Sequence, residues 1–153
     1  MSTASLTRRS AAQQRALKLF VVLQRCASAV SGNVEANANI GDLSETEFGI
    51  LEALYHKGPL LLGDVQKKIL LSSGGVTYAI DRLAEKGLVE RRECASDRRA
   101  RYAALTARGS ALMDDVFPSH ASAIEQVMAT LTAREQDQAI ALLRKLGLGA
   151  ASN

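Results

Sequence analysis

Apolar side chains recur every three or four positions along most of the chain, which is the spacing of one face of an α-helix. Near the N-terminus this stripe runs through Leu19, Leu23, Cys26 and Val30. The pattern predicts a first helix over residues 8–31, followed by a loop in the sequence GNVEANANIGD.

Two later segments carry the sequence signal of a helix start. In LSETEF, Ser44 fits an N-cap and Glu47, three residues on, fits its capping-box partner. Thr132 and Glu135 repeat this arrangement in TARE. We expect the first of these helices to stop at the sequence KGP and the second to end at Gly147.

The middle of the chain is predicted to hold more helices and one hairpin. A short helix covers residues 61–69, and a second begins with SSGG and stops at Gly87. The sequences LVERRECA and ARYAALT predict two strands around the turn SDRR, and because they are charged throughout we expect this hairpin to project into solvent. A further helix over residues 107–131 contains Pro118, which predicts a kink or a break.

The faces of the helix that begins with SSGG differ in character. At 100° per residue, Val76, Ile80 and Leu83 fall on one side and are expected in the core. Thr77 and Tyr78 point the other way.

The start of this helix is costly, because a glycine inside a helix costs about 0.5–1 kcal/mol against alanine. Ser72, Ser73, Gly74 and Gly75 could bring a helix N-terminus close to a phosphate or base edge. The alternative is that a serine is only an N-cap and that the glycines avoid a clash between helices.

Charge is concentrated in one segment of the chain. The 153 residues suit a single globular unit and carry a net charge of only +3. Residues 86–101 hold six basic and three acidic side chains, so the whole excess lies there. A basic segment of this kind favours a polyanionic partner.

Three helices followed by a charged hairpin predict a winged helix-turn-helix, in which the third helix of the motif enters the major groove. The expected fold class is therefore mainly α with a small β-hairpin wing, with N- and C-terminal dimerisation helices. In the wing, Arg98 and Arg99 could enter a minor groove or bind phosphates, and Asp97 could orient an arginine through a charge-assisted pair. The candidate DNA-binding residues are Ser72, Ser73, Gly74, Gly75, Thr77, Tyr78, Arg82, Asp97, Arg98, Arg99 and Arg101.

The sequences LSETEFGILEAL, SSGGVTYAIDRLAEKGLVERRECASDRRARYAALTARG and FPSHASAIEQVMATLTAREQDQAIALLRKLG resemble the MarR family of bacterial transcriptional regulators. The resemblance covers nearly the whole chain, and its most specific part is DRLAEKGLVER, then Asp97-x-Arg99, then ALTARG. It implies a homodimer with interlocking terminal helices, and two winged motifs in successive major grooves of a near-palindromic operator. It also implies that Arg99 enters the minor groove and that Asp97 supports it.

One position departs from the family pattern. Many members carry Arg after the Thr of the recognition helix, where this chain has Tyr78 after Thr77. Tyrosine cannot make the bidentate contact of arginine to guanine, so the operator preference of other members does not transfer. SSGGVTY, LYHKGP and FPSHA look closest to a branch whose regulators answer to phenols, quinones or oxidants.

The expected organisation has dimerisation helices at residues 8–40 and 107–147 around a winged domain at 43–106, with flexible tails at 1–7 and 148–153. The first and last helices carry wide apolar faces that the winged motif does not need for its own core. A second copy of the chain would bury them. Repression is the expected mode, because a dimer that covers a promoter needs no further contacts.

Candidate effector residues fall into two kinds. Cys26, on the apolar stripe, could be a packed inert thiol or a redox sensor, and Cys94, in the wing, could weaken DNA binding when oxidised. Tyr55 and His56 could line a pocket for a phenol-type ligand, where the resemblance places one.

Other functional classes have weaker support. The chain lacks a glycine-rich phosphate loop, an HExxH and a GxSxG motif, so we expect no enzyme and no cofactor. Two histidines and two cysteines without close spacing predict no metal site. Apolar runs are too short for a membrane span, and so few cysteines fit a reducing, cytoplasmic compartment. A winged-helix module that binds protein and a metal-sensing regulator remain as alternatives.

Overall fold

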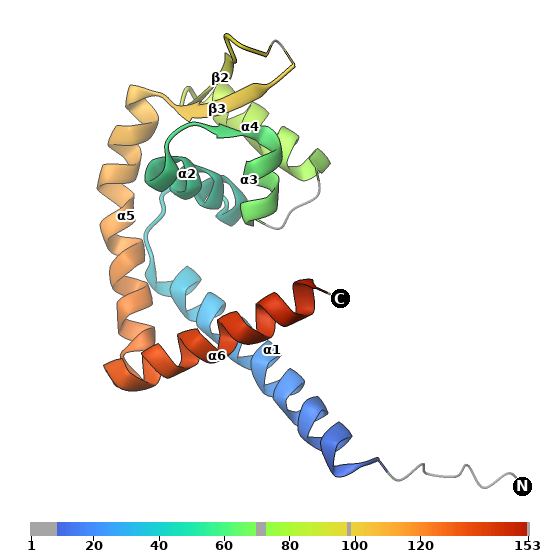
Figure 1. Ribbon diagram of the computed structural model, residues 1–153. Coiled ribbons are helices and arrows are strands. Elements are labelled where there is room, and N and C mark those ends of the chain that lie inside the picture. The colour runs from blue at the N-terminus through green and yellow to red at the C-terminus, as the bar shows by residue number, and fades with distance from the viewer. Residues whose placement is uncertain (1–8, 70–72, 98, 153) are drawn as a thin grey trace, which may run out of the picture. The chain divides into compact units, whose positions relative to one another are not determined.

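The computed structural model describes residues 9–69, 73–97 and 99–152 (Figure 1). These residues confirm the expected fold class, a mainly helical chain with a small antiparallel sheet. They form two compact units, one over residues 38–122 and one that combines residues 9–37 with 123–152. The helices are α1 (Ala11–Asn37), α2 (Glu45–Lys57), α3 (Leu62–Ile69), α4 (Ser73–Glu85), α5 (Ala107–Met128) and α6 (Ala133–Ala151), and the strands are β1 (Leu60–Leu61), β2 (Val89–Glu93) and β3 (Arg101–Leu105).

The unit of residues 38–122 is built around one hydrophobic core. The predicted inner face of α4 is confirmed, because Val76, Ile80 and Leu83 are all buried. They pack with the buried face of α2, with α3, and with the first half of α5. Other fully buried members of this core are Ile50, Leu51, Leu54, Val65 and Met113.

The sheet closes one side of this core. Its strand order is β1-β3-β2, and the hairpin pairs Val89 with Leu105 and Glu93 with Arg101. The predicted hairpin is confirmed, but the expectation that all of it projects into solvent is wrong. Val89 and Ala103 are buried at its base, because β1 adds a third strand that pairs Leu60 with Ala103.

Capping signals place the helix boundaries as expected in several cases. Ser44 caps α2 and Thr132 caps α6, and each forms the complete capping box with the glutamate three residues on. Gly87, with φ 71°, follows α4 and allows the left-handed turn into β2. Gly109 lets α5 approach the carbonyl of Leu88, where a β-carbon would have no room.

Two helices end later than predicted, and the helix that contains Pro118 is not interrupted there. The first helix ends at Asn37 rather than at 31, because Gly32 keeps a helical backbone and the Asn37 amide donates to the carbonyl of Asn33. The last helix continues past Gly147 to Ala151, since Gly147 does not adopt a positive φ. Proline 118 does not break α5, whose first half is held by buried Met113 and Val116.

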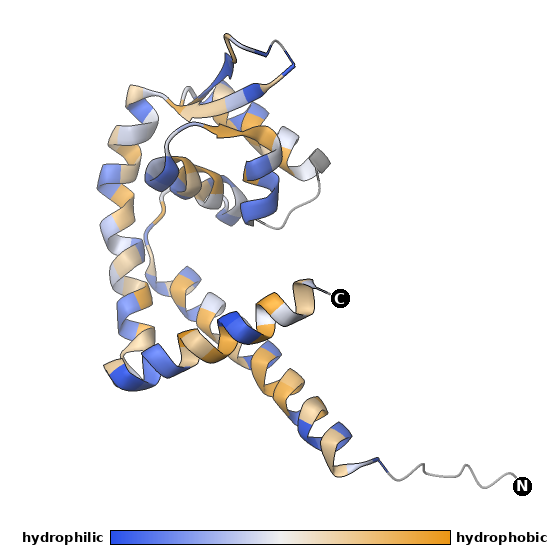
Figure 2. Cartoon of the chain, viewed as in Figure 1, coloured by the Kyte–Doolittle hydropathy of each residue, from blue (hydrophilic) through white to orange (hydrophobic). Residues whose placement is uncertain are grey.

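The second unit is built from long helices with exposed apolar side chains. Neither α1 nor α6 has a buried residue, and Figure 2 shows apolar residues along both. Phe20 is 60% exposed on α1 and Leu142 is 68% exposed on α6. No helix among the described residues is long and apolar enough to cross a membrane.

Candidate nucleic-acid interface

The outer face of α4 presents polar and aromatic side chains away from the core. Thr77 is exposed, and Tyr78 is 65% exposed despite its size. Of the predicted N-terminal residues, Ser73 and Gly74 begin the helix and Ser72 lies outside the described residues.

A cavity of about 480 Å³ lies between this face of α4 and the start of α2. Gly75, Tyr78 and Arg82 border it from α4, so three of the predicted DNA-binding residues share one hollow. The remaining lining residues are Asp42, Ser44, Thr46, Glu47 and Ala79.

A buried carboxylate lies at the inner edge of this cavity. The side chain of Glu47 is only 5% exposed, and its oxygens accept hydrogen bonds from Nζ of Lys86 at 2.8 and 2.9 Å. Arg82 Nε lies 3.4 Å from the same group. Burial alone would raise the pKa of Glu47, but the hydrogen bonds from Lys86, Ser44 and Arg82 outweigh it and lower this pKa. Glu47 is therefore ionised and paired.

Arg82 is shared between this carboxylate and the outer face of α4. Its side chain is half exposed. The phenol of Tyr78 and then the carboxylate of Glu47 raise the pKa of Arg82. The cation thus lies between a buried anion and an exposed aromatic ring one helical turn away.

The turn of the wing is organised around Asp97. Asp97 Oδ1 accepts the backbone N–H of Arg99 at 2.9 Å, and the carbonyl of Asp97 accepts that of Ala100 at 3.1 Å. Asp97 thus holds the backbone of Arg99 in an Asx turn, whereas the sequence predicted a charge-assisted pair with an arginine side chain. Arg99 and Arg101 are exposed, and Arg98 lies outside the described residues.

An ion pair joins the hairpin to α4. Arg91 on β2 lies 2.7 Å from the carboxylate of Asp81 on α4. Sequence reasoning missed this pair because its members are ten residues apart and in different elements. Its only signal was the acidic residue on the outward face of a helix that precedes a basic hairpin.

The two cysteines lie in different units. Cys26 is exposed on α1. Cys94 is half-buried at the end of β2, with its Sγ 3.1 Å from Oγ of Ser96. The hydrogen bond from Ser96 and the nearby backbone N–H groups lower the pKa of the Cys94 thiol.

An aromatic cluster joins α2 to α5 in the unit of residues 38–122. The predicted effector residues Tyr55 and His56 meet there, with ring centroids 5.3 Å apart. Phe117 packs 4.8 Å from His56, and the hydroxyl of Tyr55 donates to Asp114 at 2.7 Å, which raises the pKa of Tyr55. With Phe48 and His120, the cluster contains three of the chain's six Phe and Tyr residues and both histidines.

Phe117 and His120 were not predicted as site residues. Their signal was the concentration of rings in FPSHA, in a chain with only 4% aromatic residues. Among the described residues, no group of three or more His, Cys, Asp or Glu side chains could hold a metal ion.

Comparison with known proteins connects this geometry to a family. Residues 41–100, which include α2, α3, α4 and the first wing strand β2, match the model of the MarR family. The chain is also 37% identical over 137 residues to the HTH-type transcriptional regulator MhqR of Bacillus subtilis (strain 168), across 90% of this chain and 94% of that protein. The chain belongs to the MarR family.

Solved structures of MarR-like regulators share the fold. One is BpsR of Bordetella bronchiseptica, solved in work on the regulation of its DNA binding by 6-hydroxynicotinic acid, with a TM-score of 0.75, 25% identity, and coverage of 85% of this chain and 98% of that one. Another is Sco3205 of Streptomyces coelicolor, a MarR family transcriptional regulator in complex with DNA, with a TM-score of 0.75, 22% identity and 93% coverage of both chains. The resemblance seen in the sequence is confirmed, and this MarR protein is a DNA-binding transcriptional regulator rather than an enzyme.

Proposed function

We propose that this MarR protein is a homodimeric repressor that binds a near-palindromic operator and is released by a small aromatic ligand or an oxidant. The observation that supports DNA reading best is the outer face of α4 beside a basic wing in one compact unit. The ion pair between Arg91 and Asp81 connects the two parts. In this proposal α4 lies in the major groove, and Arg99 at the tip of the wing enters the minor groove.

The proposed DNA contacts divide by chemistry. Thr77 and Tyr78 face base edges, where the phenol can donate one hydrogen bond or contact a thymine methyl. Arg82, Arg99 and Arg101 supply positive charge for phosphates or for a narrow groove. Ser72, Ser73, Gly74, Gly75, Asp97 and Arg98 complete the proposed interface.

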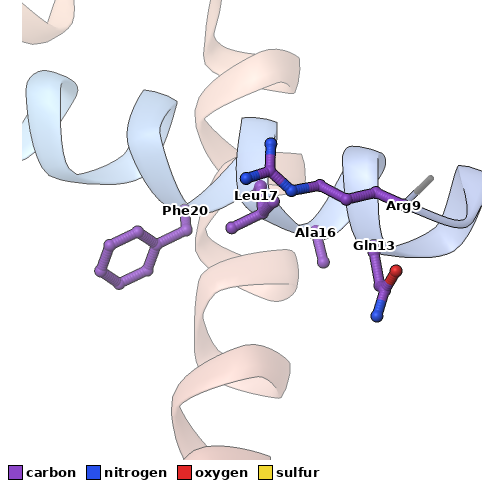
Figure 3. A pocket seen from close by; sticks show the side chains of 5 residues that line it. All are labelled: Arg9, Gln13, Ala16, Leu17 and Phe20. Atoms are coloured by element: carbon purple, nitrogen blue, oxygen red, sulfur yellow. The ribbon is translucent and has the colours of Figure 1, made fainter. Parts of the chain in front are cut away.

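The exposed apolar surface of α1 and α6 supports a homodimer. A depression of about 470 Å³ lies at the start of α1. Its lining residues, whose side chains Figure 3 shows, are Arg9, Gln13, Ala16, Leu17 and Phe20. Monomeric proteins rarely leave long apolar helix faces open to water. A two-fold dimer would also supply two recognition helices about one helical turn of DNA apart.

The aromatic cluster supports an aromatic effector. Tyr55 and His56 lie against Phe117 and combine stacking surface with polar ring edges, which suits a phenol or an aromatic acid. The DNA binding of BpsR is regulated by such an acid. Cys26 and Cys94 are the candidates for an oxidant, and the lowered pKa of Cys94 favours it as the more reactive thiol.

Fluorescence anisotropy of the purified protein on duplex DNA from its own upstream region, titrated with salt, tests this function. We expect preference over a shuffled duplex and an affinity that falls with salt, because each neutralised phosphate contributes about 0.9 to the log-log slope. Added phenol and peroxide then separate the two modes of release. Absence of salt-dependent duplex binding would contradict the proposal and favour a protein-binding module.

Repression has its own test. A reporter driven by the upstream promoter should gain activity when the gene is deleted. A reporter that falls silent instead would identify an activator.

A further inference from the structure

Three charged groups meet between the first turn of α2 and the end of α4, two elements of the unit of residues 38–122 that Figure 1 labels. The Glu47 carboxylate lies 2.8 Å from Nζ of Lys86 and 3.4 Å from Nε of Arg82. Its Oε2 also accepts the backbone N–H of Ser44 at 3.0 Å. One carboxylate therefore joins the cap of α2 to two cations at the end of the recognition helix.

We call the contact of Glu47 with Lys86 and Arg82 the charged junction. Because Glu47 is buried, the hydrogen bonds of this junction must keep a defined geometry. A carboxylate that is almost excluded from water must keep its hydrogen-bond partners, because an unpaired buried charge is strongly unfavourable. The apolar face of α4, with Val76, Ile80 and Leu83, is held by hydrophobic burial, which has no preferred direction. The charged junction thus adds a second, directional constraint on the rotation and axial position of α4 to the one that the packed core supplies.

This constraint reaches the residues proposed to face DNA. Glu47 and Arg82 border the same cavity as Tyr78 and Gly75. Arg82 is also one helical turn from Tyr78, whose phenol helps to raise the pKa of Arg82. A shift of α4 against Glu47 would therefore move Tyr78 relative to a base edge.

The second capping box shows that capping alone does not need such a junction. Glu135 completes the box with Thr132 at the start of α6, where it is exposed. No cation is paired with it among the interactions of the described residues. Glu47 performs the same capping and in addition binds Arg82 of α4 and Lys86, the residue that follows α4.

We infer that Glu47 is a positioning residue for DNA recognition, whose buried carboxylate sets the orientation of α4 through Lys86 and Arg82. This inference rests on the proposed DNA-reading function. It assigns specificity to a residue that does not itself face DNA.

The test measures the ratio of dissociation constants for two duplexes, a tight-binding sequence selected from a random pool and a shuffled sequence of equal composition. Glu47→Gln keeps an oxygen for the capping box, since glutamine also serves at this position, but removes the charge. We expect its ratio to fall about tenfold, the effect of losing one base contact. Glu135→Gln removes an equal charge from the other capping box and should keep the wild-type ratio.

Thermal unfolding and the active fraction are measured for each variant, because lower stability alone reduces the active fraction without changing the ratio. Lys86→Met gives a second, milder break in the same junction, and it decides the question by itself if Glu47→Gln does not fold. If Glu47→Gln folds, a reduced ratio in that variant supports the inference and a wild-type ratio overturns it. If Glu47→Gln does not fold, the ratio of Lys86→Met is interpreted in the same way. A wild-type protein without preference for the selected duplex would overturn the proposed function and the inference together.

Discussion

The two units of this MarR protein differ in how far their apolar side chains are buried. In the unit of residues 38–122, α2, α3, α4 and the sheet enclose a core that contains fully buried Ile80 and Leu83. In the other unit, α1 and α6 have no buried residue. Apolar stripes on helices are therefore buried within the chain in the unit of residues 38–122, and they remain exposed on α1 and α6.

The difference separates two sources of stability. The unit of residues 38–122, which we call the reading unit, depends on packing within the chain, so it can present α4 and the wing at a fixed geometry. The terminal helices depend, in our proposal, on a second copy, so their stability is linked to protein concentration. Variants in the two units should consequently fail in different ways.

Truncation of the core should have the largest effect. Leu83→Ala removes a fully buried side chain from α4 and should lower the free energy of unfolding by about 2–5 kcal/mol. Urea unfolding followed by circular dichroism at one protein concentration measures it. Tyr78→Ala, on the exposed face of the same helix, should change stability by less than about 0.5 kcal/mol. Equal losses in both variants would contradict the division of α4 into a core face and a reading face.

A charge on α6 should break the proposed dimer with little effect on the reading unit. Leu142→Lys places a cation on an exposed apolar surface, and a two-fold interface would contain it twice. We expect the dimer dissociation constant to rise about a hundredfold, as measured by sedimentation equilibrium. Ala141→Lys adds the same charge one position away and should leave the dimer intact. A monomeric wild-type protein would refute the proposed role of α1 and α6.

Sequence reasoning succeeded where structure is set by neighbouring residues. The cap of Ser44 with Glu47, the stop at Gly87 and the inner face of α4 all follow from signals within a few positions. Gly147 shows the limit of such signals, because a glycine terminates a helix in this way only when its own backbone adopts the left-handed conformation, and Gly147 does not.

Features that join distant residues could not be predicted in this way. Strand β1 has two residues and exists because Leu60 and Leu61 pair with β3 about forty positions later. The contact of Glu47 with Lys86 spans a similar separation. For α1 the sequence predicted burial of the stripe by a second copy of the chain, and the structure shows that α1 has no buried residue of its own.

Loss of a wing arginine should weaken DNA binding without affecting either unit's stability. Arg99→Ala removes an exposed cation from a turn whose backbone is held by Asp97. We expect affinity for the selected duplex to fall about tenfold, and the salt slope to decrease by about one per wing. Arg134→Ala, an exposed arginine on α6, should leave both unchanged. Unchanged binding in Arg99→Ala would remove the wing from the proposed interface.

The smallest effect should come from the pH dependence of the two capping glutamates. Hydrogen bonds lower the pKa of Glu47 below the ordinary glutamate value of 4.5, so the unfolded chain binds more protons than the folded one in this range. The stabilisation by Glu47 is thus complete above pH 4.5 and is lost as the pH falls through the folded-state value. It should amount to about 1 kcal/mol, because Lys86 and Arg82 remain partly exposed to water.

Urea unfolding of the wild type and Glu47→Gln at several pH values between 7 and 3 measures this contribution. The difference between the two curves should be constant near neutral pH and should shrink below pH 4.5. Glu135, whose pKa is lowered by hydrogen bonds from Thr132 alone, should give a smaller difference of the same sign in Glu135→Gln. Equal differences from the wild type in the two variants would mean that Lys86 and Arg82 add nothing to the pH dependence of the capping box.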